Sequence, residues 1–243
     1  MIEKHVDITS RMGPIPSFAV CPEGPGNFPP IVLYMDAPGI REELRNLARR
    51  IAKHGYFVLL PDMYYRLGTL RFDMVRRAEG MRAAMFAAMN SLTNQLVVDD
   101  TAAWLGWLDA QEKVTPGPVG CIGYCMSGKF VTTVAARFPN RFVASASLYG
   151  VGIVTDKPDS PHLLADKIKG RMYFGFAEHD EHVPANVIPT LKDALGAART
   201  KYLLEVYPGS HHGYQFPERD VYDTHAAEGS WEKIFTMWHE TLK

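Results

Sequence analysis

The residues with the clearest chemical potential form the block Gly-Tyr-Cys-Met-Ser-Gly at 123–128, where an apolar run ends and a helical pattern begins. This spacing is typical of a nucleophile elbow, a tight strand-to-helix turn that exposes one reactive side chain. The small residues at 123, 127 and 128 would let the backbone pass close to neighbouring elements. The protruding residue would be Cys125, and a helix N-terminus favours the thiolate, the nucleophilic form of cysteine. We therefore predict a cysteine nucleophile.

Two other interpretations of this turn remain open. Ser127 is a rival nucleophile, because serine is the commoner residue in such turns, but a serine elbow needs small residues two positions away on each side, and Lys129 is not small. Cys125 could also be a buried small apolar residue, which is the usual place of a free cysteine.

A thiolate needs a base that also protonates the leaving group, and an acid that orients this base. Two later loops supply them. Asp180 lies in the loop 177–184, after the apolar run 172–176, and His212 lies in the loop 208–214, after the run 202–207. The order nucleophile, acid, histidine is the order found in α/β-hydrolase folds.

Each of these loops offers more than one candidate. Glu178 and Glu181 compete with Asp180, and His211 competes with His212. We favour His212 because Gly213 gives the following backbone the freedom to fold over the elbow.

An oxyanion formed during acyl transfer needs two preorganised N–H donors. The residue after the nucleophile normally supplies one, and the loop after the third strand supplies the other. These positions correspond to Met126 and Ala37. Pro38, in the same loop as Ala37, has no N–H to donate.

The elements that would position these residues alternate from residue 31 onward. Short apolar runs predict strands covered on both faces, at 31–35, 57–60, 119–123, 142–148, 172–176 and 202–207. Helical patterns lie near 40–54, 73–90, 94–112, 126–138, 184–198 and 229–242. This alternation predicts an α/β fold with a mostly parallel central sheet and helices on both faces. No linker or repeat interrupts it, so we predict a single domain over residues 1–243.

One helical pattern carries an unusual apolar face. Met74, Met81, Met85 and Met89 share one side of the helix predicted near 73–90. We expect these side chains to lie in the core, although a flexible methionine wall could also border an acyl pocket.

Composition excludes several classes of partner. A formal net charge of -1 over 243 residues gives no attraction to nucleic acid or to an anionic membrane. Three cysteines form no even disulfide framework, which favours a reducing cytoplasm. Residues 1–7 contain no apolar h-region, so we expect no leader peptide, and no run is long enough to cross a bilayer. We expect a soluble cytoplasmic protein, a monomer or weak homodimer, whose partner is a small-molecule substrate.

Two functions of other classes compete with hydrolysis by a thiol. The stretch Glu-His-Asp-Glu-His at 178–182, with His211 and His212, suggests a metal-dependent hydrolase. It lacks the i, i+4 histidine pair on a helix that zinc proteases use, and Cys125 would be unexplained. A non-catalytic binding module with the same fold is the other alternative. We expect neither a metal nor a cofactor.

From about residue 31 to residue 214 the chain resembles the dienelactone hydrolase family, the carboxymethylenebutenolidase-like branch of the α/β-hydrolases. The resemblance rests on Asp-x-x-Gly at 36–39, Gly-Tyr-Phe-Val-Leu-Leu-Pro-Asp at 55–62, the block at 123–128 and the two loops above. It implies an α/β-hydrolase fold and a cysteine-dependent hydrolase that acts on esters or lactones of small molecules. It also implies a triad of Cys125, Asp180 and His212, with N–H donors from Met126 and Ala37.

Two positions depart from the family pattern. The family usually has glutamate at the position of Asp36, where it contacts the nucleophilic thiol of the resting enzyme. Members that open dienelactone hold the substrate carboxylate with two arginines; Arg82 falls near the first position and Phe216 stands at the second, with Arg219 as an open substitute. We expect Arg82, Tyr124 and Phe216 to contact substrate in a comparatively apolar pocket. Neutral esters and lactones should then be hydrolysed at least comparably to carboxylate-bearing ones.

Overall fold

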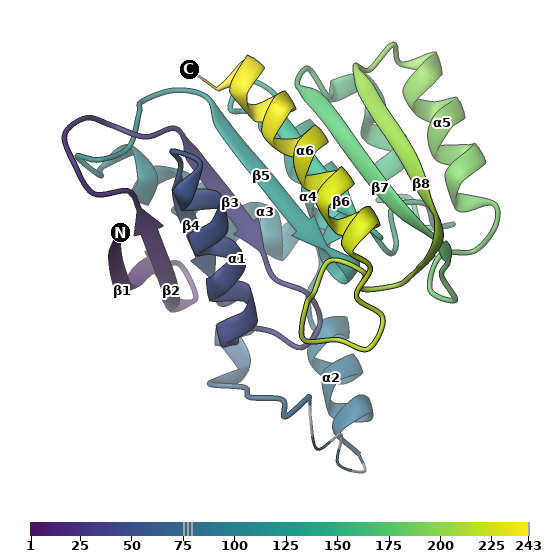
Figure 1. Ribbon diagram of the computed structural model, residues 1–243, viewed down its shortest axis with the longest axis horizontal. Coiled ribbons are helices and arrows are strands. Elements are labelled where there is room, and N and C mark those ends of the chain that lie inside the picture. Colours follow the sequence, from purple (N-terminus) through teal and green to yellow (C-terminus); the bar gives the residue numbers. More distant parts are fainter. Residues whose placement is uncertain (75, 77, 79, 243) are drawn as a thin grey trace. The chain divides into compact units, whose positions relative to one another are not determined.

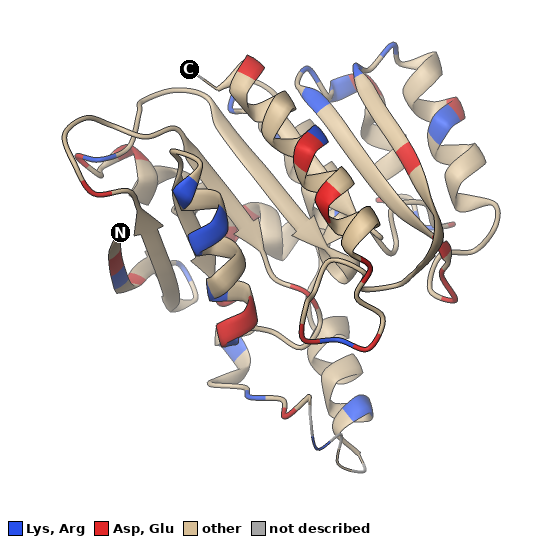
Figure 2. Cartoon of the chain, in the orientation of Figure 1, with Lys and Arg blue, Asp and Glu red and all other residues tan. Residues whose placement is uncertain are grey.

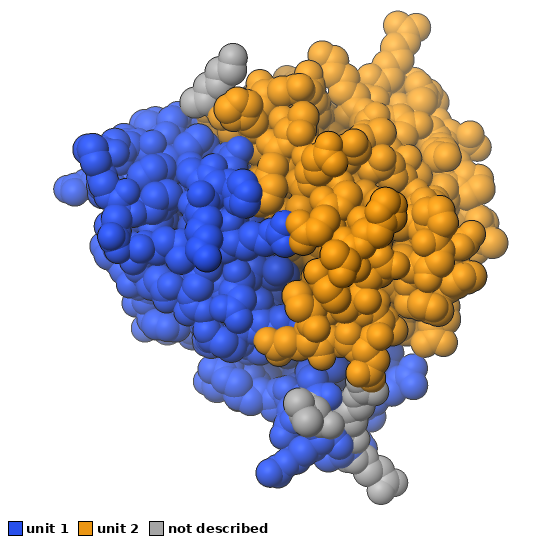
Figure 3. Space-filling model, in the orientation of Figure 1, with its two compact units in different colours: residues 1–117 blue, residues 118–243 orange. Residues whose placement is uncertain are grey.

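The computed structural model describes every residue except 75, 77, 79 and 243. The chain divides into two compact units, Met1–Gly117 and Pro118–Lys243, which Figure 3 shows in blue and orange. Each unit has its own strands and its own covering helices. The single domain predicted over residues 1–243 stays a prediction.

The strands described in the N-terminal unit lie in the order β1-β2-β4-β3. They are β1 (Ile2–Ser10), β2 (Gly13–Cys21), β3 (Pro30–Tyr34) and β4 (Phe57–Pro61). β3 and β4 are parallel and fully buried, as predicted from their apolar runs. β1 and β2 pair antiparallel, and β2 pairs antiparallel with β4. The sequence did not predict β1 and β2, because β1 is largely exposed and β2 begins exposed, so no continuous apolar run marks the start of the hairpin.

The helices of this unit are α1 (Glu42–Lys53), α2 (Met81–Asn90) and α3 (Asn94–Asp109), with a short 3-10 helix, η1 (Tyr65–Leu67). α1 buries Leu44, Leu47, Ala48 and Ile51, an i, i+3, i+4, i+7 stripe that packs against β4 and β2. α3 begins at a capping residue, Thr93, whose Oγ1 accepts the N–H of Leu96 at 3.1 Å.

α2 corrects two expectations. It begins at residue 81 rather than near 73, directly after Gly80, whose φ of +80° lies in the left-handed region; positions 75, 77 and 79 of the predicted helix lie outside the described residues. Its only buried residue is Ala88, and the methionines at 81, 85 and 89 are half-buried. These methionines are therefore not core residues.

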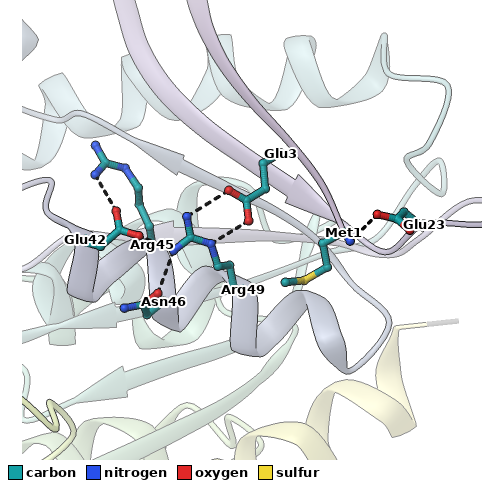
Figure 4. Close-up of polar contacts among 7 residues, drawn as sticks. All are labelled: Met1, Glu3, Glu23, Glu42, Arg45, Asn46 and Arg49. Carbon is teal, nitrogen blue, oxygen red and sulfur yellow. Dashed lines mark hydrogen bonds and ion pairs between the residues drawn. The ribbon is translucent and has the colours of Figure 1, made fainter.

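Ion pairs connect α1 with the first strand (Figure 4). The Arg49 guanidinium donates to both oxygens of Glu3, at 2.7 and 3.0 Å, and also to Glu42 and Asn46 on its own helix. Because these groups are partly exposed to solvent, each pair contributes at most about 1 kcal/mol to stability. Charges of both signs are interspersed along the helices and loops (Figure 2), in keeping with the formal net charge of -1.

The C-terminal unit contains four parallel strands in the order β5-β6-β7-β8. They are β5 (Val119–Tyr124), β6 (Phe142–Leu148), β7 (Arg171–His179) and β8 (Tyr202–His211). Every residue of β5 and all but one of β6 are buried, which explains why apolar runs predicted them. The carboxyl ends of these strands lie at one edge, where α/β proteins place their functional loops.

Helices cover both faces of these four strands. They are α4 (Gly128–Arg137), α5 (Val187–Ala197) and α6 (Thr224–Thr241), with two 3-10 helices, η2 (Cys125–Ser127) and η3 (Pro161–Lys167). In Figure 1, α6 lies in front of the strands and α4 lies behind them. α6 begins five residues before its predicted start, because Asp223 caps it by accepting the N–H of Ala226 at 2.9 Å.

Candidate active site

Cys125 lies on a strained turn directly after β5. Its φ is +53°, in the left-handed region that costs a non-glycine residue about 1–2 kcal/mol. Its side chain is partly exposed, whereas Ser127, the alternative nucleophile, is completely buried. The elbow therefore presents the thiol and hides the hydroxyl.

Close packing explains the small residues of the elbow. A Cβ atom on Gly128 would lie 2.3 Å from Cα of Gly150, and one on Gly123 would lie 2.7 Å from a methyl group of Val131. The loop after β6 is also fastened to the elbow, because the N–H of Val151 donates to the Cys125 carbonyl at 2.9 Å. The close approach predicted from the sequence is confirmed.

The strand register brings Asp180 and His212 together. His179 on β7 pairs with His211 on β8, so the residues that follow them, Asp180 and His212, lie side by side at the ends of the two strands. Nδ1 of His212 donates to Oδ2 of Asp180 at 2.8 Å, and only 13% and 3% of the two side chains are exposed. The other carboxylate oxygen, Oδ1, accepts the backbone N–H of His182 at 2.9 Å. The carboxylate is thus held from two sides.

The competing residues of the two loops lie elsewhere. Glu178 accepts the N–H of Gly209 at 2.7 Å, and 80% of the Glu181 side chain is exposed. The His211 ring packs against the His179 ring, with centroids 5.1 Å apart. Within the described part of these two loops, His212 and Asp180 form the buried pair of an imidazole and a carboxylate.

The surroundings of His212 favour its protonated form. Burial acts to lower the pKa of this imidazole, but the hydrogen bond with Asp180 and the nearby Cys125 sulfur outweigh burial and raise the pKa to about 9. Nε2 is buried, and no close hydrogen bond satisfies it among the described residues. This nitrogen can therefore exchange a proton with the Cys125 sulfur or with a substrate.

The other two cysteines have different surroundings. Cys121 and Cys21 are both buried, and burial raises the pKa of the Cys121 thiol to about 12 and also raises that of Cys21. Their thiols therefore stay protonated and shielded at neutral pH.

Two aromatic rings pack against the His212 imidazole, and one of them, Tyr149, was not singled out from the sequence. Tyr149 has its ring centroid 4.9 Å from that of His212, and His182 has its ring centroid 4.7 Å away; both contacts are edge-to-face. Tyr149 directly follows β6, whose last residue, Leu148, pairs with Tyr124 just before Cys125; like Cys125 it has a positive φ, +38°. The sequence feature that could have identified Tyr149 is its position directly after an apolar run, at the carboxyl end of a strand.

The structure corrects the expectation that Tyr124 and Phe216 contact substrate. Both side chains are completely buried, with ring centroids 5.1 Å apart. The guanidinium of Arg219 lies over the Phe216 ring, 4.3 Å from its centroid. Neither ring has a surface exposed to a substrate.

The remaining candidates belong to the N-terminal unit. Asp36 is completely buried, and its two oxygens accept from the Arg41 guanidinium at 2.5 and 3.1 Å; the same guanidinium also binds Glu43. The Ala37 carbonyl accepts from the Tyr64 hydroxyl at 2.9 Å. Arg82 is exposed on α2, with its guanidinium 5.6 Å from the Phe86 ring centroid. The roles given to Asp36, Ala37 and Arg82 stay predictions.

Metal ligation was the main chemical alternative. No cluster of three or more His, Cys, Asp or Glu side chains suited to a metal ion occurs in the described part of the chain.

None of the described helices is both long enough and apolar enough to span a bilayer.

Comparison with known proteins identifies the relatives of this chain. The model of the "Dienelactone hydrolase family" matches residues 15–242 and so extends through both compact units. A protein of Synechocystis sp. named "Putative carboxymethylenebutenolidase" is 27% identical over 98% of this chain and 99% of its own length.

Solved structures share the fold. A Klebsiella pneumoniae structure described as a "Putative Dienelactone Hydrolase" matches with a TM-score of 0.87 and 22% identity, over 98% of each chain. The dienelactone hydrolase from Anabaena variabilis matches with a TM-score of 0.70 and 16% identity, over 100% of this chain and 99% of its own. The predicted α/β-hydrolase fold is confirmed.

Proposed function

Because the chain belongs to the dienelactone hydrolase family, we propose that it hydrolyses esters or lactones of small molecules through an acyl-enzyme on Cys125. The observation that supports this most strongly is the buried pair of His212 and Asp180, joined by a hydrogen bond of 2.8 Å. The Cys125 sulfur, on the strained elbow, lies close enough to this imidazole to raise its pKa. Nucleophile, base and orienting acid each follow a parallel strand at the same edge.

The proposed first half-reaction transfers the acyl group to sulfur. The Cys125 thiolate attacks the carbonyl carbon, and the carbonyl oxygen becomes an oxyanion. The backbone N–H of Met126 is the first proposed oxyanion donor, and that of Ala37 is the second. As the tetrahedral intermediate collapses, the carbon–oxygen bond to the leaving alkoxide breaks, and His212 Nε2 gives it a proton.

The second half-reaction returns the enzyme to its starting state. Water attacks the thioester carbonyl, His212 accepts the proton of that water, and the carbon–sulfur bond breaks to release the carboxylic acid product. The hydrogen bond to Asp180 keeps the proton on Nδ1 throughout, so that Nε2 is the nitrogen that exchanges protons.

The setting of this reaction is also part of the proposal. The partner is a small-molecule ester or lactone, and neither nucleic acid nor a membrane is needed. The three cysteines carry no disulfide, which agrees with a reducing cytoplasm. We propose that the protein acts as a monomer or weak homodimer.

Steady-state hydrolysis tests the proposal. Wild-type protein and Cys125→Ala are compared on para-nitrophenyl acetate and on a neutral lactone, each with and without a chelator. We expect wild type to turn over both substrates regardless of the chelator, and Cys125→Ala to lose about three orders of magnitude or more in kcat. Full activity in Cys125→Ala would contradict the proposal, and loss of wild-type activity with the chelator would favour a metal hydrolase.

A further inference from the structure

Lys129 shares an unusual property with the proposed nucleophile. Every residue of the segment 119–136 is buried except Cys125 and Lys129, which are half-buried. The two residues are four positions apart, and Lys129 lies in the first turn of α4. Cys125 lies on the left-handed turn that precedes the helix, and its sulfur is close enough to act electrostatically on the Lys129 ammonium. The surface that this segment presents is therefore a thiol with a cation beside it.

The Lys129 ammonium packs against an aromatic ring. Among the described residues its ammonium contacts the face of the Phe130 ring, 4.7 Å from the centroid, and no carboxylate forms an ion pair with it. Its stem runs along the loop after β6, because a Cβ atom on Gly152 would lie 3.3 Å from Lys129 Cδ. A cation in this place faces the positive end of the α4 dipole, which opposes it.

The electrostatic surroundings agree with this geometry. Burial lowers the pKa of Lys129, and the neighbouring charge of Lys157 lowers it further, while Asp159 and Cys125 act in the opposite direction. A partly desolvated cation that is repelled by a second cation gains from an added anion.

We propose that Lys129 is a specificity-determining residue that binds a carboxylate on the substrate, a few bonds from the carbonyl that Cys125 attacks. This inference rests on the proposed hydrolysis at Cys125. It revises the expectation of a comparatively apolar pocket, which considered Arg82, the position of Phe216 and Arg219 as places for a cation. Lys129 lies at none of these positions, so an anionic substituent would be bound from the helix that follows the elbow.

A matched pair of substrates tests the assignment. The neutral substrate is para-nitrophenyl hexanoate, and the anionic one is the mono-para-nitrophenyl ester of adipic acid, which has the same chain length. We expect Lys129→Met to lower kcat/KM for the anionic ester by about tenfold or more, while the neutral ester changes by less than about twofold. Lys129→Arg should restore the anionic preference. Arg137→Met, which removes a cation from the other end of α4, is the control and should change neither value.

A second readout does not depend on turnover. The monoamide of adipic acid and hexanamide are tested for their ability to slow alkylation of Cys125 by iodoacetamide. The anionic amide should protect the thiol of wild type and of Lys129→Arg, but not that of Lys129→Met. If the anionic amide protects Cys125 in this way but no ester is hydrolysed, the proposed hydrolysis is wrong and the carboxylate-binding role of Lys129 is supported. If Lys129→Met slows both esters equally, or leaves both the anionic ester and the protection unchanged, the assignment of Lys129 is overturned.

Discussion

Replacing Asp180 by asparagine is the sharpest perturbation of the proposed triad, because the side chain keeps its size but loses its charge. Oδ2 of Asp180 accepts from Nδ1 of His212 at 2.8 Å, and only 3% of the Asp180 side chain is exposed. An asparagine can instead direct an N–H group at Nδ1 and so select the wrong imidazole tautomer. We expect kcat to fall by about three to four orders of magnitude.

The same substitution should change how stability depends on pH. In the folded protein the pKa of His212 is about 9, above its ordinary value of 6.5. Its stabilising contribution is therefore fully present below pH 6.5 and is lost as the pH rises to about 9. A difference of this size corresponds to about 3 kcal/mol. In Asp180→Asn burial still lowers the pKa, but the hydrogen bond that opposes it most strongly is gone, so this loss should shrink.

Urea unfolding between about pH 6 and pH 9.5 measures the effect. Wild type should lose up to about 3 kcal/mol of unfolding free energy over this range beyond what Asp180→Asn loses. Glu181→Gln removes the neighbouring exposed carboxylate and should behave like wild type. The reasoning is refuted if Asp180→Asn keeps both its turnover and the wild-type pH slope.

Three further predictions concern the elbow and the choice of residues. Gly128→Ala should lower the unfolding free energy by about 1–3 kcal/mol or more, because the new Cβ would lie 2.3 Å from the neighbouring backbone, whereas Gly196→Ala, with open space around it, should leave urea stability unchanged or slightly raised. His212→Ala should cost about three orders of magnitude in kcat and His211→Ala little; the reverse result would invert the assignment. Peptide mapping after brief iodoacetamide treatment should find the elbow thiol alkylated and Cys121 unmodified, and alkylation of Cys121 alone would contradict this order.

Much of the fold could be predicted because buried parallel strands leave a plain signal. β5 and β6 are buried almost throughout and form continuous or nearly continuous apolar runs in the sequence. β1 could not be found in this way, because it is mostly exposed and held by pairing with β2 and by ion pairs such as that between Glu3 and Arg49. The sequence predicts too early a start for α2, because its half-buried methionines have the same helical spacing as the apolar residues of a buried helix face.

The candidate site was predicted from strand ends rather than from contacts. Asp180 and His212 could be selected because each follows an apolar run, and Gly213 indeed has a positive φ, +93°. The edge-to-face contact of Tyr149 with the imidazole depends on strand register, which a single sequence does not reveal. The partial exposure of Lys129 stands out because every other residue of the segment 119–136 except Cys125 is buried. Burial is a property of the folded chain, so the sequence did not reveal it.

The central claim is that an acyl group is carried by the sulfur of Cys125, and an intact-mass spectrum after brief exposure to a short activated ester tests it most directly. The account predicts a single acyl increment on wild-type protein, mapped by peptide digestion to Cys125 and absent from Cys125→Ala. An increment of the same size on Cys125→Ala, or rapid wild-type turnover with the acyl group mapped to another residue, would contradict it.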